Sequence, residues 1–155
     1  MSLVIKVYFA AGMLLFAIPA FGQGTTKSDK ASAPDQEIVF EEGSWEEVAA
    51  QAKRTGKYIF VDAYTNWCAP CRLLKTTTFK EQRAARFYNT NFINYTADME
   101  AGEGIELAEQ WDITAYPALL FFSPEGKIVF RQIGFVDGVK LLEFGQQVLA
   151  TNHLQ

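Results

Sequence analysis

The sequence predicts an α/β fold in which helices cover both faces of a mixed central β-sheet. Apolar segments of strand length alternate with helical segments in the order β-α-β-α-β-α-β-β-α. Helical crossovers join parallel strands in the first part, whereas a hairpin and a final helix close the chain, so the sheet should be mixed. With 155 residues, 49% of them hydrophobic and 21% charged, the chain is long enough for one domain with a buried core.

The first 22 residues have the features of an export signal. Lys6 precedes an uncharged apolar run over 7–18, and small residues up to Gly22 suit a signal peptidase that cleaves after that position. The run is shorter than the about 20 residues of a membrane-spanning helix, although a retained anchor is the alternative. Residues 23–36 are polar and predict a flexible linker, which leaves 37–155 as the folded domain. We therefore expect a periplasmic or secreted protein.

The first elements of the domain each have a local signal. Residues 38–40 form a short apolar run that predicts a strand. Residues 44–47, Ser-Trp-Glu-Glu, have the form of a capping box and should begin a helix that ends before Gly56. Residues 58–63 are mostly apolar, with β-branched and aromatic side chains, and predict a strand buried on both faces. Asp62 is the one charged residue inside it.

The next segment predicts a longer helix, from about residue 68 to 89. Three consecutive threonines at 76–78 should weaken or bend it, because β-branched side chains are restricted in a helix. The remaining predicted elements are a strand over 92–97, a short helix over 105–111, strands over 118–122 and 128–133 joined by a Ser-Pro-Glu-Gly turn at 123–126, and an amphipathic helix over 137–149.

Charge and residue counts exclude several classes of protein. Lys and Arg number 14 and Asp and Glu 18, so the net charge of −4 offers no basis for binding nucleic acid or anionic lipid. The two cysteines are too few for a disulfide-stapled scaffold, and with His153 as the one histidine no zinc ligand set is complete. We predict no metal and no cofactor. The following acidic residues are expected to be a solvated helix face: Glu100, Glu103, Glu106 and Glu109.

The reactive groups of the sequence are concentrated in Trp67-Cys68-Ala69-Pro70-Cys71. A Cys-x-x-Cys directly after a buried strand places the first sulfur at a helix start, where free N–H groups and the helix dipole stabilise a thiolate. The second sulfur, one turn later, can attack a mixed disulfide formed on the first. Pro70 suits the first turn because it lacks an N–H. A metal site and a purely structural disulfide are the alternatives to a redox pair.

Two segments resemble the thioredoxin superfamily. Residues 61–72, Val-Asp-Ala-Tyr-Thr-Asn-Trp-Cys-Ala-Pro-Cys-Arg, resemble its active-site strand and helix, and residues 114–119, Thr-Ala-Tyr-Pro-Ala-Leu, resemble its cis-proline loop. The likeness covers roughly 37–150 and implies a thioredoxin fold. Within the superfamily the chain resembles plain thioredoxin or the periplasmic C-terminal domain of transmembrane thiol:disulfide interchange proteins of the disulfide reductase D type. A Trp-Cys-x-x-Cys-x7-Phe pattern that ends at Phe79, together with the export signal, favours the latter.

The resemblance implies roles at the redox pair. Cys68 would be the exposed nucleophile, Cys71 the buried resolving thiol, and Asp62 the proton acceptor for Cys71. Independently, an Asp in an apolar strand is costly unless it is functional or hydrogen-bonded, and burial raises its pKa towards that of a useful base. A hydrogen-bonded structural Asp is the alternative. One departure is Asn94, which stands where thioredoxin has a lysine near the buried Asp.

The resemblance also implies a substrate-binding set. Trp67 would shield the nucleophile and shape the docking surface, with simple packing as the alternative. Ala69 and Pro70 lie between the cysteines, and Ala69 replaces the family's glycine. Pro117 would be cis, with Tyr116 presenting backbone groups to an extended substrate.

The function expected from these residues is that of an exported thiol–disulfide oxidoreductase acting on cysteines of other proteins, as a monomer and in the reducing direction. A membrane-bound or soluble redox partner must regenerate the pair, because nothing in the sequence does so. The alternative is a peptide-binding or chaperone-like module with incidental redox activity. The cysteine pair together with Asp62 and Pro117 favours the enzyme, since a pure binding module needs none of them.

Overall fold

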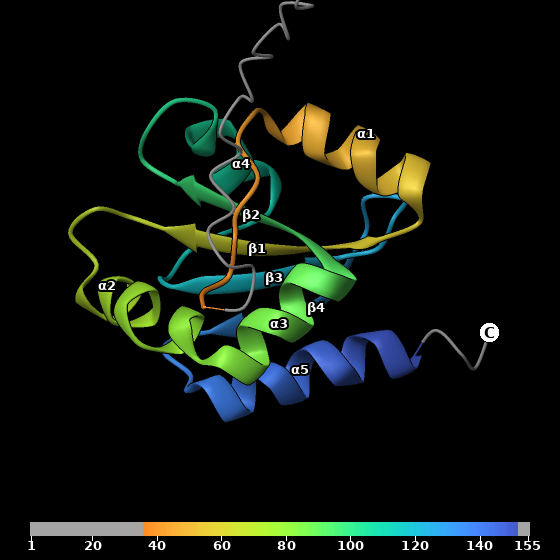
Figure 1. Ribbon diagram of the computed structural model, residues 1–155. Coiled ribbons are helices and arrows are strands. Elements are labelled where there is room, and N and C mark those ends of the chain that lie inside the picture. Colours follow the sequence, from red (N-terminus) through yellow and green to blue (C-terminus); the bar gives the residue numbers. More distant parts are fainter. Residues whose placement is uncertain (1–35, 152–155) are drawn as a thin grey trace, which may run out of the picture. The chain divides into compact units, whose positions relative to one another are not determined.

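A mixed four-stranded sheet lies at the centre of the domain (Figure 1). The computed structural model describes residues 36–151, so the predicted signal segment and all but the last residue of the predicted linker lie outside the described residues. The strand order is β2-β1-β3-β4, with β1 and β2 parallel and the other pairs antiparallel. The strands are β1 (Tyr58–Tyr64), β2 (Phe92–Asp98), β3 (Ala118–Phe122) and β4 (Ile128–Ile133).

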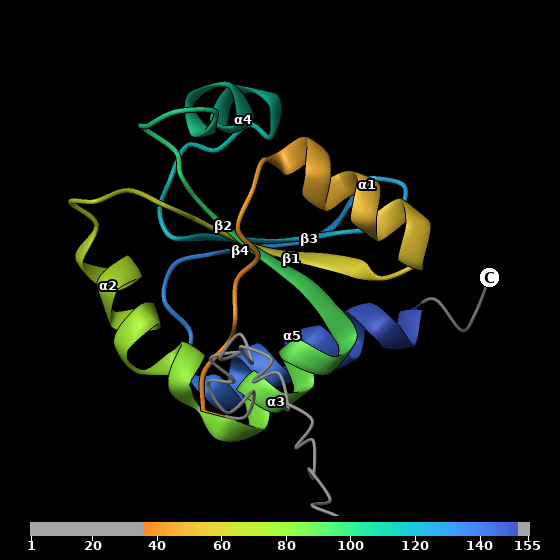
Figure 2. The same ribbon diagram turned by 45° about the horizontal axis from the view of Figure 1, so that its top comes forward.

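Helices cover both faces of this sheet, as predicted (Figure 2). One face carries α1 (Trp45–Thr55) and α4 (Gly104–Gln110). The other carries α2 (Ala69–Thr76), the 3-10 helix η1 (Thr78–Lys80), α3 (Gln82–Asn91) and α5 (Gly138–Ala150).

Alternation along the central strand β1 divides the core in two. Ile59, Val61 and Ala63 pack with α1 and α4, whereas Phe60 packs with the helices of the opposite face. Successive side chains of a strand point to opposite faces, so Asp62 shares the face of Phe60. This face is the one that α2 covers, and the carboxyl therefore lies beneath the helix that carries Cys71.

Local capping explains where α1 begins and ends. The Ser44 hydroxyl accepts a hydrogen bond from the Glu47 N–H at 3.3 Å, and the Glu47 carboxylate accepts one from the Ser44 N–H at 2.8 Å. Gly56 closes the helix in the left-handed conformation, with φ of 71°. The predicted capping box and helix end are confirmed.

The threonine run interrupts the predicted long helix, which the structure divides into α2, η1 and α3. The Thr77 hydroxyl donates to the Leu73 carbonyl at 2.7 Å, and the Thr78 hydroxyl donates to the Val136 carbonyl at 2.6 Å. The second bond ties the break to the segment before α5. As a result, α2 is a separate short helix that presents Cys71 to the sheet.

The predicted strand over 38–40 is wrong. The Ile38 N–H donates to the Phe79 carbonyl, the Val39 N–H to the Asn89 side chain, and the Glu41 N–H to the Asn94 carbonyl. These three acceptors belong to a 3-10 helix, a side chain and a strand, so no regular ladder can form. Apolar character alone does not distinguish such an extended segment from a strand.

A glycine allows the chain to turn sharply after β2. A side chain at Gly104 would collide with the backbone carbonyl of Asp98, which leaves no room for a Cβ. The connection 99–103 is therefore held against the end of β2. It brings Glu100 close to the start of α2.

Candidate active site

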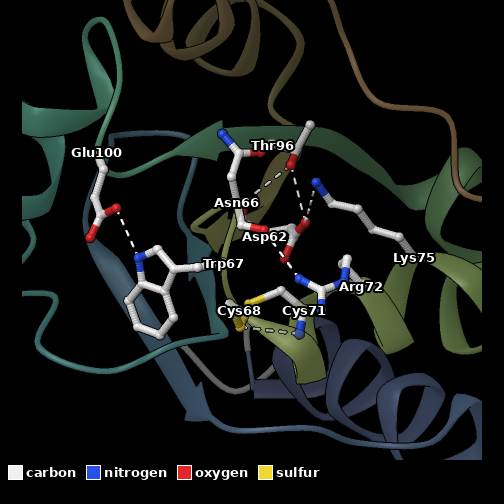
Figure 3. The surroundings of a disulfide bond; sticks show 9 residues. All are labelled: Asp62, Asn66, Trp67, Cys68, Cys71, Arg72, Lys75, Thr96 and Glu100. Atoms are coloured by element: carbon white, nitrogen blue, oxygen red, sulfur yellow. Dashed lines mark hydrogen bonds and ion pairs between the residues drawn. A yellow bond between two sulfur atoms is a disulfide. The ribbon is translucent and has the colours of Figure 1, made fainter.

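A disulfide joins Cys68 and Cys71 at the start of α2 (Figure 3). Cys68 is the N-cap residue of this helix, and its Sγ accepts a hydrogen bond from the Cys71 N–H at 3.1 Å. Pro70 occupies the first turn, where the helix needs no N–H donor. A sulfur in this position faces free backbone donors and the positive end of the helix dipole, both of which stabilise a thiolate.

The expectation that Cys68 is exposed is wrong for this disulfide state. Cys68 is 2% exposed and Cys71 is 1% exposed. The cause is the N-cap geometry, because the Cys68 sulfur turns back over the first helical turn towards Cys71 instead of pointing into solvent. The neighbouring Ala69 and Pro70 are exposed.

Trp67 forms the rim of the site beside Cys68. Its side chain is 65% exposed, so packing in the core does not explain it. The indole N–H donates to Glu100 Oε2 at 2.9 Å (Figure 3). The indole ring meets the ring of Tyr116 edge-on at a centroid distance of 6.0 Å. This contact brings the cis-proline loop next to the residue that precedes the redox pair.

The Tyr116–Pro117 peptide bond is cis, as the resemblance implied. Pro117 is buried and Tyr116 is half-buried. The Pro117 carbonyl accepts a hydrogen bond from the Gly134 N–H at 2.8 Å, which ties the loop to the end of β4. The backbone that leads into β3 is thereby held at the same end of the sheet as the disulfide.

Asp62 is fully buried in β1 and faces α2. Its Oδ2 accepts a hydrogen bond from the Thr96 hydroxyl at 3.1 Å and lies 4.0 Å from the Lys75 ammonium, whereas Oδ1 has no hydrogen-bond partner among the described residues. Burial raises the pKa of Asp62 from its ordinary 3.8 to about 6, against the opposing effects of Lys75 and Thr96. A carboxyl with such a pKa exchanges protons near neutral pH.

Lys75 was not among the predicted site residues, although it lies four residues after Cys71 and hence on the same face of α2. Its ammonium also lies over the ring of Tyr64, 3.1 Å from the centroid. Burial lowers the pKa of Lys75, while Asp62 and Asp98 oppose that change. The helical spacing from Cys71, combined with the need of a buried carboxylate for a counter-charge, is the signal that could have identified it.

Glu100 was also missed, because the acidic stretch was expected to be a solvated helix face. Glu100 binds the Trp67 indole, and Glu103 accepts a hydrogen bond from the Tyr95 hydroxyl at 2.6 Å.

Asn94, which stands where thioredoxin has a lysine near the buried Asp, directs its amide away from the Asp62 carboxyl. Its amide donates to the Val39 carbonyl and to the Asn89 side chain.

A pocket of about 210 Å³ opens beside the disulfide, lined by Tyr64, Thr65, Asn66, Cys71, Arg72 and Lys75. It is large enough to admit water to the Cys71 side of the pair. Within residues 36–151, no group of three or more His, Cys, Asp or Glu could hold a metal ion. No helix in that part of the chain has the length and apolar character needed to cross a bilayer.

Comparisons with known proteins agree with this geometry. A family model described as a thioredoxin-like domain matches residues 45–149. The thiol:disulfide interchange protein DsbD of Pseudoalteromonas atlantica is 26% identical over 153 residues, which cover 96% of this chain and 26% of that protein. The chain thus spans about a quarter of the length of this relative. A thioredoxin of Mycoplasmoides gallisepticum is 30% identical over 93 residues, covering 60% of this chain and 86% of its own.

Solved structures show the same fold. A candidate disulphide-isomerase from Bacteroides thetaiotaomicron is 38% identical, with a TM-score of 0.64, and the match covers 72% of this chain and 95% of that one. A thioredoxin from Thermus thermophilus has the same TM-score at 20% identity, covering 74% and 88% of the two chains, and supports the fold alone. The chain belongs to the thioredoxin-like family of disulfide oxidoreductases.

Proposed function

We propose that this protein is an exported oxidoreductase that reduces disulfides in other proteins through Cys68 and Cys71. The observation that carries the proposal is a disulfide at the start of α2 above a buried carboxyl whose pKa is about 6. The relatives named as thiol:disulfide interchange proteins support this class of substrate. The apolar run at 7–18 and the polar segment that follows it support export.

The reaction begins with the reduced pair. The Cys68 thiolate attacks one sulfur of the substrate disulfide, which breaks that bond, releases one substrate thiolate and forms a mixed disulfide. Asp62 accepts the proton of Cys71, directly or through one water, and the Cys71 thiolate attacks Cys68 Sγ. The second substrate thiolate leaves as the Cys68–Cys71 bond closes. Two electrons pass to the substrate. A dithiol partner, membrane-bound or soluble, then reduces the Cys68–Cys71 disulfide and restores the reduced pair.

The substrate is proposed to bind across the rim of the site. Trp67 and Tyr116 offer neighbouring aromatic rings, and the cis-proline loop offers backbone groups to an extended chain. Ala69 and Pro70 are exposed between the two cysteines and complete the contact surface. Aromatic side chains suit this task because they supply contact area at low entropic cost.

A reduction assay on insulin, with dithiothreitol as the electron source, tests the proposed function. The wild-type protein should accelerate insulin precipitation well above the rate of dithiothreitol alone. The double variant Cys68→Ser/Cys71→Ser keeps the proposed peptide-binding rim and serves as the matched control. Equal rates for the two proteins would favour the peptide-binding alternative.

The two thiols of the reduced protein should differ in reactivity. We expect iodoacetamide to alkylate Cys68 about tenfold or more faster than Cys71, because free N–H groups and the helix dipole at the N-cap position stabilise a thiolate there. Peptide mass spectrometry after brief labelling at neutral pH measures the ratio. Equal labelling of both cysteines would reverse or remove the assignment of Cys68 as nucleophile.

A further inference from the structure

Two different elements converge on one oxygen of the buried carboxyl. Thr96 from β2 donates to Asp62 Oδ2 at 3.1 Å, and the Lys75 ammonium from α2 lies 4.0 Å from the same atom (Figure 3). On the neighbouring strand β3, the residue paired with Asp62 is Leu119, which is apolar. A carboxylate with no exposure depends strongly on the charge nearest to it.

Lys75 is placed to act on Asp62 and to reach solvent. Its side chain is 37% exposed, whereas Asp62 has no exposed surface. Lys75 lines the pocket shared with Cys71, and it also lines a second one of about 260 Å³ shared with Thr96. The spacing of four residues keeps Cys71 and Lys75 on one face of α2, so both side chains approach β1 from the same helix.

We propose that Lys75 is a positioning residue for the proton acceptor: its ammonium stabilises the ionised Asp62 that takes the proton of Cys71. This inference rests on the proposed role of Asp62. The site differs from the arrangement implied by the resemblance, because Asn94 on β2 points its amide to Val39 and Asn89. The counter-charge is instead supplied by the helix that also carries the resolving cysteine.

The other charged and titratable groups around the pair do not replace Lys75. Tyr64, on the strand of Asp62, contributes the ring beneath the ammonium. Asp98, at the end of β2, is an anion that favours the charged form of Lys75. Cys71 is held in the disulfide and does not titrate in this state. Among the described residues, Lys75 is the cation that forms an ion pair with Asp62.

Lys75→Met should raise the pKa of Asp62 by about one unit or more, because a cation within about 4–6 Å lowers a carboxyl pKa by that amount. Methionine keeps an unbranched apolar side chain and removes the ammonium that lies over Tyr64. Lys75→Arg should leave the pKa close to that of the wild type. Lys80→Met is the matched control, since Lys80 pairs with Glu37 instead.

The titration is measured by carbon-detected NMR of the Asp62 carboxyl in the oxidised protein, in which neither cysteine titrates. Asp62→Asn identifies the resonance. A parallel single-turnover assay follows the pH dependence of mixed-disulfide resolution, whose inflection should move upward with the carboxyl pKa in Lys75→Met.

Two outcomes would overturn the inference. If the Asp62 titration is the same in the wild type and Lys75→Met, Lys75 does not control the carboxyl. If the titration moves and the rate profile stays fixed, the pair has no part in resolution. Failure of the wild type to reduce insulin would reject the proposed function and leave the titration result unchanged, so the two can fail separately.

Discussion

Cys71→Ser should convert the protein from a catalyst into a trap for its substrates. The resolving attack on the mixed disulfide needs the second thiolate, so the variant should hold substrates on Cys68 and its insulin reduction should fall to the rate of dithiothreitol alone. Serine is close in size and keeps the N–H that donates to Cys68. Adducts are captured from an extract of exported proteins and identified after release with dithiothreitol.

The matched variant Cys68→Ser separates the two cysteines. It should lose turnover equally and capture no adducts, because Cys71 lacks the N-cap position that stabilises a thiolate. Adducts on Cys68→Ser and none on Cys71→Ser would exchange the two roles. Such a result would leave the family assignment untouched and reject the order of attack.

Asp62→Asn should slow disulfide exchange and make the protein more stable. Loss of the proton acceptor removes a contribution that is commonly on the order of 100-fold in rate. The stability gain follows because the variant no longer buries an ionisable carboxyl, and an Asn can still accept the hydrogen bond of Thr96. The exchange rate near pH 7 and the urea midpoint of unfolding measure the two effects.

The stability effect should depend on pH in a defined direction. The folded state raises the pKa of Asp62 from 3.8 to about 6, so the folded protein binds the proton more tightly than the unfolded chain. Wild-type stability from this group is therefore fully present below pH 4 and is lost as the pH rises through 6. The full difference is about 3 kcal/mol, since one pH unit corresponds to about 1.4 kcal/mol.

The advantage of Asp62→Asn in urea should accordingly widen between pH 4 and pH 8. Thr96→Val, which removes the hydrogen bond and keeps the carboxyl, serves as the control and should show no such gain. A less stable Asp62→Asn protein with wild-type kinetics would identify Asp62 as a structural hydrogen-bonded residue and end its role as proton acceptor.

Local chemistry accounts for the elements that the sequence predicts correctly. The two predicted strands over 118–122 and 128–133 coincide with β3 and β4, because the Ser-Pro-Glu-Gly turn between them sets their limits. The capping box marks the start of α1, and the three threonines mark the break after α2. Each of these signals lies within a few residues of the feature that it determines.

Features that depend on distant residues were predicted less well. Residues 38–40 are extended and apolar, but their hydrogen-bond partners lie 41 or more residues away and form no ladder. The disulfide and the buried Asp62 follow from the motif, whereas the neighbours of that carboxyl depend on the packing of α2 against β1. The contacts that Lys75 and Thr96 make with Asp62 are therefore known only once the chain is folded, and so is the burial of Cys68.

The central position of β1 gives Asp62 a further property. Backbone pairing joins Asp62 to Thr96 on one side and to Leu119 on the other, so the strand that carries the carboxyl is held on both sides. A surface carboxyl would relax into water and return to ordinary acidity. In β1 the carboxyl has no exposed surface, and this burial keeps its pKa above the ordinary value. The burial that makes this residue a cost to the fold is thus the same property that raises its basicity for the proposed proton transfer.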